Sequence, residues 1–428
     1  MKEVGRTETV TGGRDATMRY AAGDAALSVG MPPAPKAPVG WRWVALTEAA
    51  QMESGHTPSR RHSEYWVGDI PWIGVKDAGK SHGATITDTT EHTNELGIAN
   101  SSARLLPKGT VCLSRGGTVG YVVILGRPMA TSQGFANWIC GKELNPRFLT
   151  YLFLNEIDAL HRFSSGATIQ TIYYPDLKAF HVCIPPLPEQ KNIVGILDRA
   201  FEGIATAKAN AEKNLQNTRA LFDSYLQTVF TPPGHGWQEK RLGDVADVQS
   251  GGTPSVSRKE YWGGGTPWYS SGELNDLFTV EPERTITDVG LAGSNAKVFP
   301  KGALLIGMYD TAALKMSLLD RDAAFNQAIA GVRPNAVLSP EFLLHAINAI
   351  KPRLLLERRG VRQKNLSLGK IKDILVPVPP RREQESTVTA IGIMAVHTQH
   401  LESLYRVKVC ALDELKRSLL HQAFSGKL

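Results

Sequence analysis

The chain has 428 residues, of which 42% are hydrophobic and 21% charged, and it contains eight tryptophans. This composition is typical of a soluble globular protein with two or three domains, and the net charge of +7 is compatible with a polyanionic partner. No apolar run approaches the roughly 18 residues of a membrane span, and the four cysteines show no CxxC spacing. We therefore expect a cytoplasmic protein with reduced thiols, and no disulfide framework or zinc site.

The first 39 residues are polar and rich in glycine, alanine and threonine, and they end in a proline-rich stretch, MPPAPKAPV. They lack the charged-then-apolar order of a signal peptide. We expect residues 1–39 to form a disordered tail that leads into a stiff linker.

The rest of the chain is a tandem duplication. GHTPSRRHSEYWVGDIPW begins at Gly55 and GGTPSVSRKEYWGGGTPW begins at Gly251, and the two segments match at 10 of 18 positions without a gap. Further pairs follow in the same order: TITD at 85 and 285, PKG at 107 and 300, and IPPLPEQ at 184 against VPPRREQ at 378. Each repeat covers about 190 residues, which is the size of a domain with an appendage.

The first part of each repeat, 40–186 and 236–380, mixes short β-rich runs and turn signals with a more helical stretch. The second part, 187–231 and 381–428, begins after a proline-rich turn, and most of it contains no proline. Apolar residues recur there every 3.5 residues, which predicts one long coiled-coil helix per repeat. The fold class predicted is α+β (mixed α/β): two tandem globular domains, joined and separated by two long helices.

The two long helices must bury their apolar seams, and each is the nearest partner of the other. Because the duplication implies a pseudo-two-fold axis, we expect an antiparallel coiled coil. Lys208 and Glu402 are equivalent polar positions near the two midpoints. In a full-overlap pair they would meet and fix the register; the alternative is that both charges point to water.

Motifs for catalysis and for cofactors were not found in the sequence. There is no methylase Asn/Asp-Pro-Pro-aromatic motif, no complete phosphate-binding loop, and no GxSxG or HExxH. His397 and His400 share a helical face, but no third ligand is close in sequence. The sequence therefore offers no candidate active site, cofactor site or metal site.

The GxTPS…EYW…PW opening, the Pro-Pro…Glu-Gln entry into each long helix and the ending LKRSLLHQAFSGKL together resemble the specificity subunits of type I restriction–modification systems. The resemblance covers about residues 40–428, and it implies a subunit that is not itself catalytic and carries no cofactor, in agreement with the missing motifs. It implies that each globular unit is a target-recognition domain for half of a bipartite, asymmetric site in double-stranded DNA. It also implies that the helices act as spacers that dock two methyltransferase subunits, with motor–nuclease subunits joining them for restriction.

Residues that recur in both copies, such as Thr57, Tyr65, Trp66 and Trp72, are predicted to be structural, because readers of two different half-sites would differ. The better candidates for DNA contact are polar residues that differ between the copies. These candidates are Arg60, Arg61, Arg115 and Gln170 in the first domain, and Arg258, Lys259, Lys315, Arg358, Arg362 and Lys364 in the second.

Two other functions remain open at this point. The chain could be a DNA methyltransferase that carries its own recognition domains, although methylase motifs are missing. It could also be a duplicated ligand-binding scaffold unrelated to DNA. Salt-dependent, bipartite DNA binding would separate the second alternative from DNA recognition.

Overall fold

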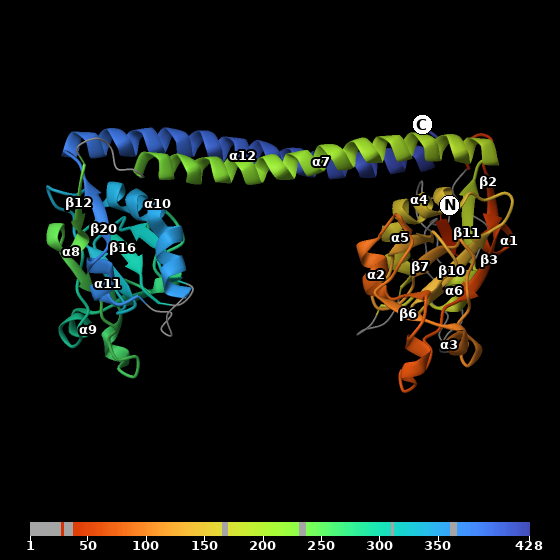
Figure 1. Ribbon diagram of the computed structural model, residues 1–428, viewed down its shortest axis with the longest axis horizontal. Coiled ribbons are helices and arrows are strands. Elements are labelled where there is room, and N and C mark those ends of the chain that lie inside the picture. Colours follow the sequence, from red (N-terminus) through yellow and green to blue (C-terminus); the bar gives the residue numbers. More distant parts are fainter. Residues whose placement is uncertain (1–26, 30–36, 165–169, 231–236, 310–311, 360–365) are drawn as a thin grey trace, which may run out of the picture. The chain divides into compact units, whose positions relative to one another are not determined.

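The computed structural model describes residues 27–29, 37–164, 170–230, 237–309, 312–359 and 366–428. The chain divides into two compact units, Met1–Asn210 with Lys408–Leu428, and Ala211–Val407. Each unit holds one globular domain and parts of two helices of 44 residues, α7 (Leu187–Phe230) and α12 (Arg381–Phe424) (Figure 1). The predicted mixed fold with two long helices is confirmed.

The first domain is built around a five-stranded sheet with the order β3-β10-β7-β8-β5. All neighbours in it are antiparallel except β5 and β8, which are parallel. Its strands are β3 (Ala50–Ser54), β10 (Phe135–Cys140), β7 (Val111–Ser114), β8 (Val122–Leu125) and β5 (Thr85–Ile86). Two three-stranded sheets adjoin it: β6 (Glu91–Thr93), β4 (Ile70–Ile73) and β9 (Ala130–Thr131), and β1 (Leu27–Val29), β11 (Phe180–Ile184) and β2 (Arg42–Ala45). The helices are α1 (Leu46–Ala49), η1 (Ser63–Trp66), α2 (Val75–Lys80), α3 (Glu95–Ala99), α4 (Pro146–Asn155), α5 (Ile157–Phe163) and α6 (Tyr174–Lys178).

The second domain repeats this plan with fewer strands. Its antiparallel sheet has the order β13 (Val248–Ser250), β19 (Ile329–Val332), β16 (Leu304–Gly307) and β17 (Met316–Leu318). The smaller sheets are β15 (Arg284–Ile286), β14 (Trp262–Tyr269) and β18 (Ala324–Phe325), and β12 (Gln238–Arg241) with β20 (Leu375–Val378). The helices are α8 (Leu242–Val245), η2 (Lys259–Tyr261), η3 (Ser271–Glu273), α9 (Asp288–Ala292), α10 (Pro340–Arg359) and α11 (Leu368–Lys372).

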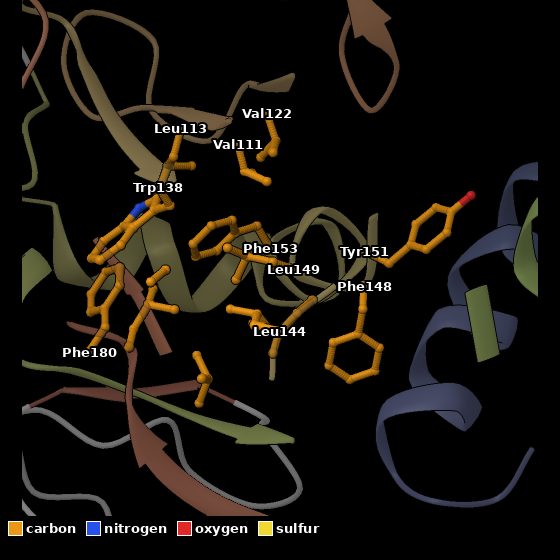
Figure 2. Close-up of a cluster of buried hydrophobic side chains, with 14 of the residues drawn as sticks. Val111, Leu113, Val122, Trp138, Leu144, Phe148, Leu149, Tyr151, Phe153 and Phe180 are labelled. Carbon is orange, nitrogen blue, oxygen red and sulfur yellow. The ribbon is translucent and has the colours of Figure 1, made fainter. Parts of the chain in front are cut away.

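Helix α4 joins the first domain to the long helices, because its two faces are both apolar. Figure 2 shows Leu149 and Phe153 on the side of the sheet residue Trp138, while Phe148 and Tyr151 point the other way. Phe148 meets Phe424 of α12 with ring centroids 5.1 Å apart. In the second unit the equivalent pair, Phe342 and Phe230, lies 5.3 Å apart. Each globular domain therefore shares its core with the end of a long helix.

The predicted coiled-coil seam is confirmed in both helices. All ten seam positions of α7 and nine of the ten of α12 are buried or half-buried; these are Val194, Leu197, Phe201, Ile204, Lys208, Ala211, Leu215, Thr218, Phe222 and Tyr225, and Val388, Ile391, Ala395, Thr398, Glu402, Tyr405, Val409, Leu412, Lys416 and Leu419. Lys416 is the exposed one, with Nζ 5.1 Å from the ring centroid of Phe201. In the first unit the beginning of α7 lies beside the end of α12, and in the second the end of α7 lies beside the beginning of α12. The packing is antiparallel, as predicted.

The register differs from the full overlap that would bring Lys208 to Glu402. Instead, Lys208 Nζ lies 2.7 Å from Asp413 Oδ1 in the first unit, and Arg219 Nε lies 3.4 Å from Glu402 Oε1 in the second. The residue numbers add to 621 in both pairs. At the repeat offset of 194, these are equivalent pairs with their charges reversed. Asp413 lies eleven residues beyond Glu402 in sequence, or about 16 Å along the helix.

The physical reason for this register lies at the helix starts. About ten residues at the start of each helix extend past the end of the partner helix and pack on a globular domain instead. The same register brings Phe424 beside Leu197 and Phe230 beside Ile391, and all four are nearly fully buried. Burial of these end residues in the domain cores outweighs the gain from full helix overlap.

The glutamine of the Pro-Pro…Glu-Gln motif ties each helix to its domain. The Gln190 side chain is fully buried, and its Oε1 accepts a hydrogen bond from Asn145 N at 2.8 Å. Its Nε2 donates to Glu143 O at 2.8 Å and to Pro185 O at 2.9 Å. Gln384 makes the same three bonds to the equivalent backbone atoms of the second unit. The motif recurs because each helix start needs this connection.

Two expectations from the sequence need correction. Part of the tail, β1, pairs with β11 and supplies hydrogen bonds that this sheet edge would otherwise lack; residues 1–26 and 30–36 lie outside the described residues. The TITD match is also not a structural equivalence, because Thr85–Ile86 pairs with β8, whereas Thr285–Ile286 pairs with β14. None of the described helices is long and apolar enough to cross a membrane.

Candidate nucleic-acid interface

The recurring opening segment of each domain, 55–72 and 251–268, begins with a glycine that permits a close chain crossing. A Cβ atom on Gly55 would lie 2.0 Å from Ser132 O, and one on Gly251 would lie 2.1 Å from Phe325 O. No larger residue fits at these distances without displacing the backbone. The glycine of the GxTPS motif is therefore structural in both copies.

The two tryptophans of each opening segment donate hydrogen bonds to backbone carbonyls of the same segment. Trp72 Nε1 donates to His56 O at 3.0 Å, and Trp66 Nε1 donates to Ser59 O at 3.3 Å. The two indoles meet edge-on with centroids 5.1 Å apart and an interplanar angle of 88°. The second copy repeats both hydrogen bonds and has the same indole distance and angle. These contacts account for the recurrence of the two tryptophans.

Other loops of the first domain meet beside the opening segment. Thr57 Oγ1 donates to Gln133 Oε1, which places the turn at 132–134 against the segment. Arg115 N donates to Gly134 O and Ile172 N donates to Arg115 O, each at 2.8 Å. The second domain forms the same network through Met308, which stands at the position of Arg115. The two copies therefore share one loop framework that carries different side chains.

Arg60 is held in the structure by Trp66 and Glu91. Its guanidinium carbon lies 3.7 Å from the Trp66 ring centroid, and its Nη2 donates to Glu91 Oε2 at 2.8 Å. A second hydrogen bond joins Arg60 Nη1 to Glu91 Oε1. Hydrogen bonding to Glu91 raises the pKa of Arg60, and the same contact lowers the pKa of the Glu91 carboxyl. Arg61, next in sequence, is exposed and has no ion pair among the described side chains.

Arg115 and Gln170, predicted from separate stretches of sequence, are brought onto adjoining loops. An isolated bridge joins Gly116 to Thr171. The Arg115 guanidinium carbon lies 4.1 Å from the Tyr174 ring centroid, and its Nη1 donates to Ile172 O at 3.1 Å. Gln170 is exposed. This pair of loops is a candidate surface for DNA contact.

The candidates of the second domain are distributed over several elements. Arg258 Nη1 donates to Tyr261 OH at 2.7 Å, and the neighbouring Lys259 is exposed. Lys315 Nζ donates to Asn275 Oδ1 at 2.8 Å. Burial and the charge of Lys315 lower the pKa of Lys351 in α10. Among the remaining candidates, the side chain of Arg358 and the whole of Arg362 and Lys364 lie outside the described residues.

Arg284 is a further candidate for DNA contact that was not predicted from the sequence. In β14 and β15 it lies opposite Trp268, just as Glu91 lies opposite Trp72 in β4 and β6. Its guanidinium carbon is 5.4 Å from the Trp262 ring centroid. The signal was present: Glu91 and Arg284 differ by 193, the offset shared by the two PKG motifs. The TITD match, at an offset of 200, concealed it.

Comparison with known proteins identifies the family. The model of the type I restriction modification DNA specificity domain matches residues 38–216 and again 234–392. The MjaIX specificity subunit of Methanocaldococcus jannaschii is 26% identical over 289 residues, which are 63% of this chain and 66% of that protein. The EcoR124I/EcoR124II specificity subunit of Escherichia coli is 25% identical over 45% of this chain and 48% of its own length. The matches thus span less than two thirds of these relatives.

Two solved structures share the fold. The HsdS subunit from Thermoanaerobacter tengcongensis superposes with a TM-score of 0.62 at 21% identity, over 92% of this chain and 99% of that one. A chain from a structure of type I R-M system assembly and conformational transition gives a TM-score of 0.76 at 20% identity, over 92% and 100%. Within the described residues, no three His, Cys, Asp or Glu side chains are grouped so that they could hold a metal ion. With its two matched domains, the chain belongs to the family of type I restriction–modification DNA specificity subunits.

Proposed function

We propose that this chain is the DNA-recognition subunit of a type I restriction–modification complex in the cytoplasm. Each globular domain recognises one half of a bipartite, asymmetric DNA site, and the chain itself carries out no catalysis. The observation that carries this proposal is the duplicated loop framework with unlike side chains. Arg115 is replaced by Met308, although the surrounding hydrogen bonds are the same. Two domains of one architecture but different surfaces suit two different half-sites.

The position of the opening segment is suited to contact with DNA. In the first unit, the segment that contains η1 and the neighbouring α3 project from the side of the domain away from α7 (Figure 1). In the second unit, the segment next to α9 projects from the side away from α12 (Figure 1). These segments are thus accessible to a duplex while the opposite side of each domain packs on the helices.

We assign α12 to the docking of a methyltransferase subunit. Its described face carries large apolar side chains that the seam with α7 leaves exposed: Ile393, Val396, Leu401, Leu404 and Val407. Four of these, at 393, 396, 404 and 407, correspond in α7 to Arg199, Glu202, Asn210 and Lys213 at the same offset. An exposed apolar stripe on a helix is typical of a surface that packs against a partner helix. We propose that the complete complex contains two methyltransferase subunits, with motor–nuclease subunits added for restriction.

Co-expression with the methyltransferase subunit of the same system tests the proposed function. Genome-wide mapping of methylated bases should give one bipartite motif with unlike halves. Expression of this chain without the methyltransferase should give no methylation. A continuous motif, or methylation by this chain alone, would refute the proposal.

Two variants test the docking surface. Leu404→Glu should lower the amount of methyltransferase that co-purifies per chain and leave the thermal unfolding of this chain unchanged, because the side chain is 51% exposed. Asn210→Glu, at the equivalent position of α7, serves as the matched control and should not affect co-purification. Equal loss in both variants would contradict the assignment of this surface to α12.

The helices also provide a test of half-site spacing. Inserting one heptad at equivalent positions of α7 and α12 adds about 10 Å to each helix. If helix length sets the gap, the mapped motif should gain about three base pairs at about 3.4 Å each. An unchanged gap with intact methylation would show that another element determines the spacing.

A further inference from the structure

The hollow beside Trp262 in the second domain differs in charge from the same place in the first domain. The hollow has a volume of about 430 Å³ and is lined by Val256, Lys259, Trp262, Gly263, Glu283, Arg284 and Thr285. Two cations and one carboxylate face it, so its net charge is positive. In the first domain the equivalent indole, Trp66, is covered by Arg60, which forms an ion pair with Glu91.

The difference comes from two exchanged positions. Arg60 corresponds to Val256 at the offset of the opening segment, and Glu91 corresponds to Arg284 in the strand register. The first domain thus places a cation over the indole and pairs that cation with a carboxylate. The second domain places a cation there from the strand β15, whereas Arg60 comes from the turn before η1, and Val256 supplies no carboxylate at the position of Arg60. Within the described residues, Arg284 has no ion-pair partner.

An arginine whose guanidinium lies over an indole face still has N–H donors available for a second partner. Arg284 is exposed, and its guanidinium carbon lies 5.4 Å from the Trp262 ring centroid. The planar fork of donors matches the oxygens of a phosphate, and an adjacent lysine adds a point charge. Lys259 lines the same hollow and is exposed. Glu283 also lines the hollow, but its single charge does not offset both cations.

We infer that Arg284 and Lys259 bind a phosphate of the DNA backbone at this hollow. The first domain makes no such contact, because Arg60 is already paired with Glu91. The inference rests on the proposed function and adds to it an asymmetry between the two recognition domains. A backbone contact positions a domain on the duplex without selecting bases. The second domain therefore gains affinity here, while base selection comes from other loops.

The test measures DNA binding by the complex with the methyltransferase, using a duplex with the mapped site and a mixed-sequence duplex, over a range of salt concentrations. In Arg284→Gln the slope of log affinity against log salt should become shallower by about 0.9, which corresponds to one lost phosphate contact. Affinity for both duplexes should fall by a similar factor, about tenfold, because no base is read. Arg60→Gln, the matched substitution, should leave the slope unchanged.

A second variant builds the Arg60–Glu91 arrangement of the first domain into the second domain. Val256→Arg with Arg284→Glu should form the covering ion pair, keep the thermal unfolding midpoint and show the same shallower slope as Arg284→Gln. An unchanged slope in Arg284→Gln would overturn the inference. So would an equal effect of Arg60→Gln, or a loss confined to the mapped site, which would indicate base recognition. If the wild-type complex fails to bind either duplex, the proposed function itself fails.

Discussion

Replacing the buried glutamine at the start of α7 should destabilise the first unit selectively. Gln190→Ala removes one acceptor and two donor bonds, and it leaves Asn145 N, Glu143 O and Pro185 O without their partner. An unpaired buried backbone group costs about 1–3 kcal/mol. Because water can reach some of these groups once the side chain is shortened, we expect a total loss of about 3 kcal/mol.

Native-state hydrogen exchange measured by mass spectrometry is the appropriate assay, because it reports the two units separately. Protection should fall in α4 and β11 in Gln190→Ala, and in α10 and β20 in Gln384→Ala. Gln190→Leu retains most of the volume, so a comparable loss in that variant would assign the effect to hydrogen bonding. Gln399→Ala, at an exposed position of α12, is the control and should change stability by less than about 0.5 kcal/mol.

A glutamate at position 190 should make the stability of the first unit depend on pH. Gln190→Glu places a carboxyl group against two carbonyl oxygens, so the folded state favours its protonated form. Its stability relative to wild type should be greatest below the ordinary glutamate pKa of about 4.3 and should fall as the pH rises. A loss of less than about 1 kcal/mol in Gln190→Ala, or no pH dependence in Gln190→Glu, would refute the reasoning.

Three further predictions concern ionisable groups. Burial, and then the charge of Lys416, lower the pKa of His82, whose Nδ1 accepts a hydrogen bond from Val122 N at 3.1 Å. The first unit should therefore lose stability as the pH falls through about 6.5. Urea unfolding at pH 7.5 and 5.5 measures this loss, and its persistence in His82→Gln would contradict the prediction. Burial raises the pKa of Cys140 and of Cys183 to about 12 and also raises that of Cys112. The exposed Cys410 should therefore be the only thiol of the folded chain that is alkylated rapidly at pH 8. Peptide mass mapping after alkylation checks this. The half-exposed Lys208–Asp413 pair should contribute at most about 1 kcal/mol to the stability of the first unit. Lys208→Asp should destabilise this unit, and adding Asp413→Lys in a double variant should restore its stability. If urea unfolding shows no restoration, the pair does not set the register.

The sequence by itself determined the duplication, the two long helices and their apolar seams. These features are local or repetitive: a 3.5-residue period requires no knowledge of the partner, and a repeat is visible wherever two segments match. The same logic identified the opening-segment residues as structural, and the Trp66–Trp72 and Trp262–Trp268 contacts agree. A glycine needed at a close chain crossing is likewise visible as a recurring residue.

The tertiary structure decided the register and the state of the candidate cations that it describes. The register follows from where Phe424 and Phe230 enter the domain cores, and from the Lys208–Asp413 and Arg219–Glu402 pairs. Arg60 is paired while Arg284 is open, and this depends on which residue lies opposite the second tryptophan of each segment, Glu91 in one domain and Arg284 in the other. Periodicity fixes which residues of a helix or strand share a face. The residue that faces them comes from a segment distant in the chain, and only long-range packing selects it.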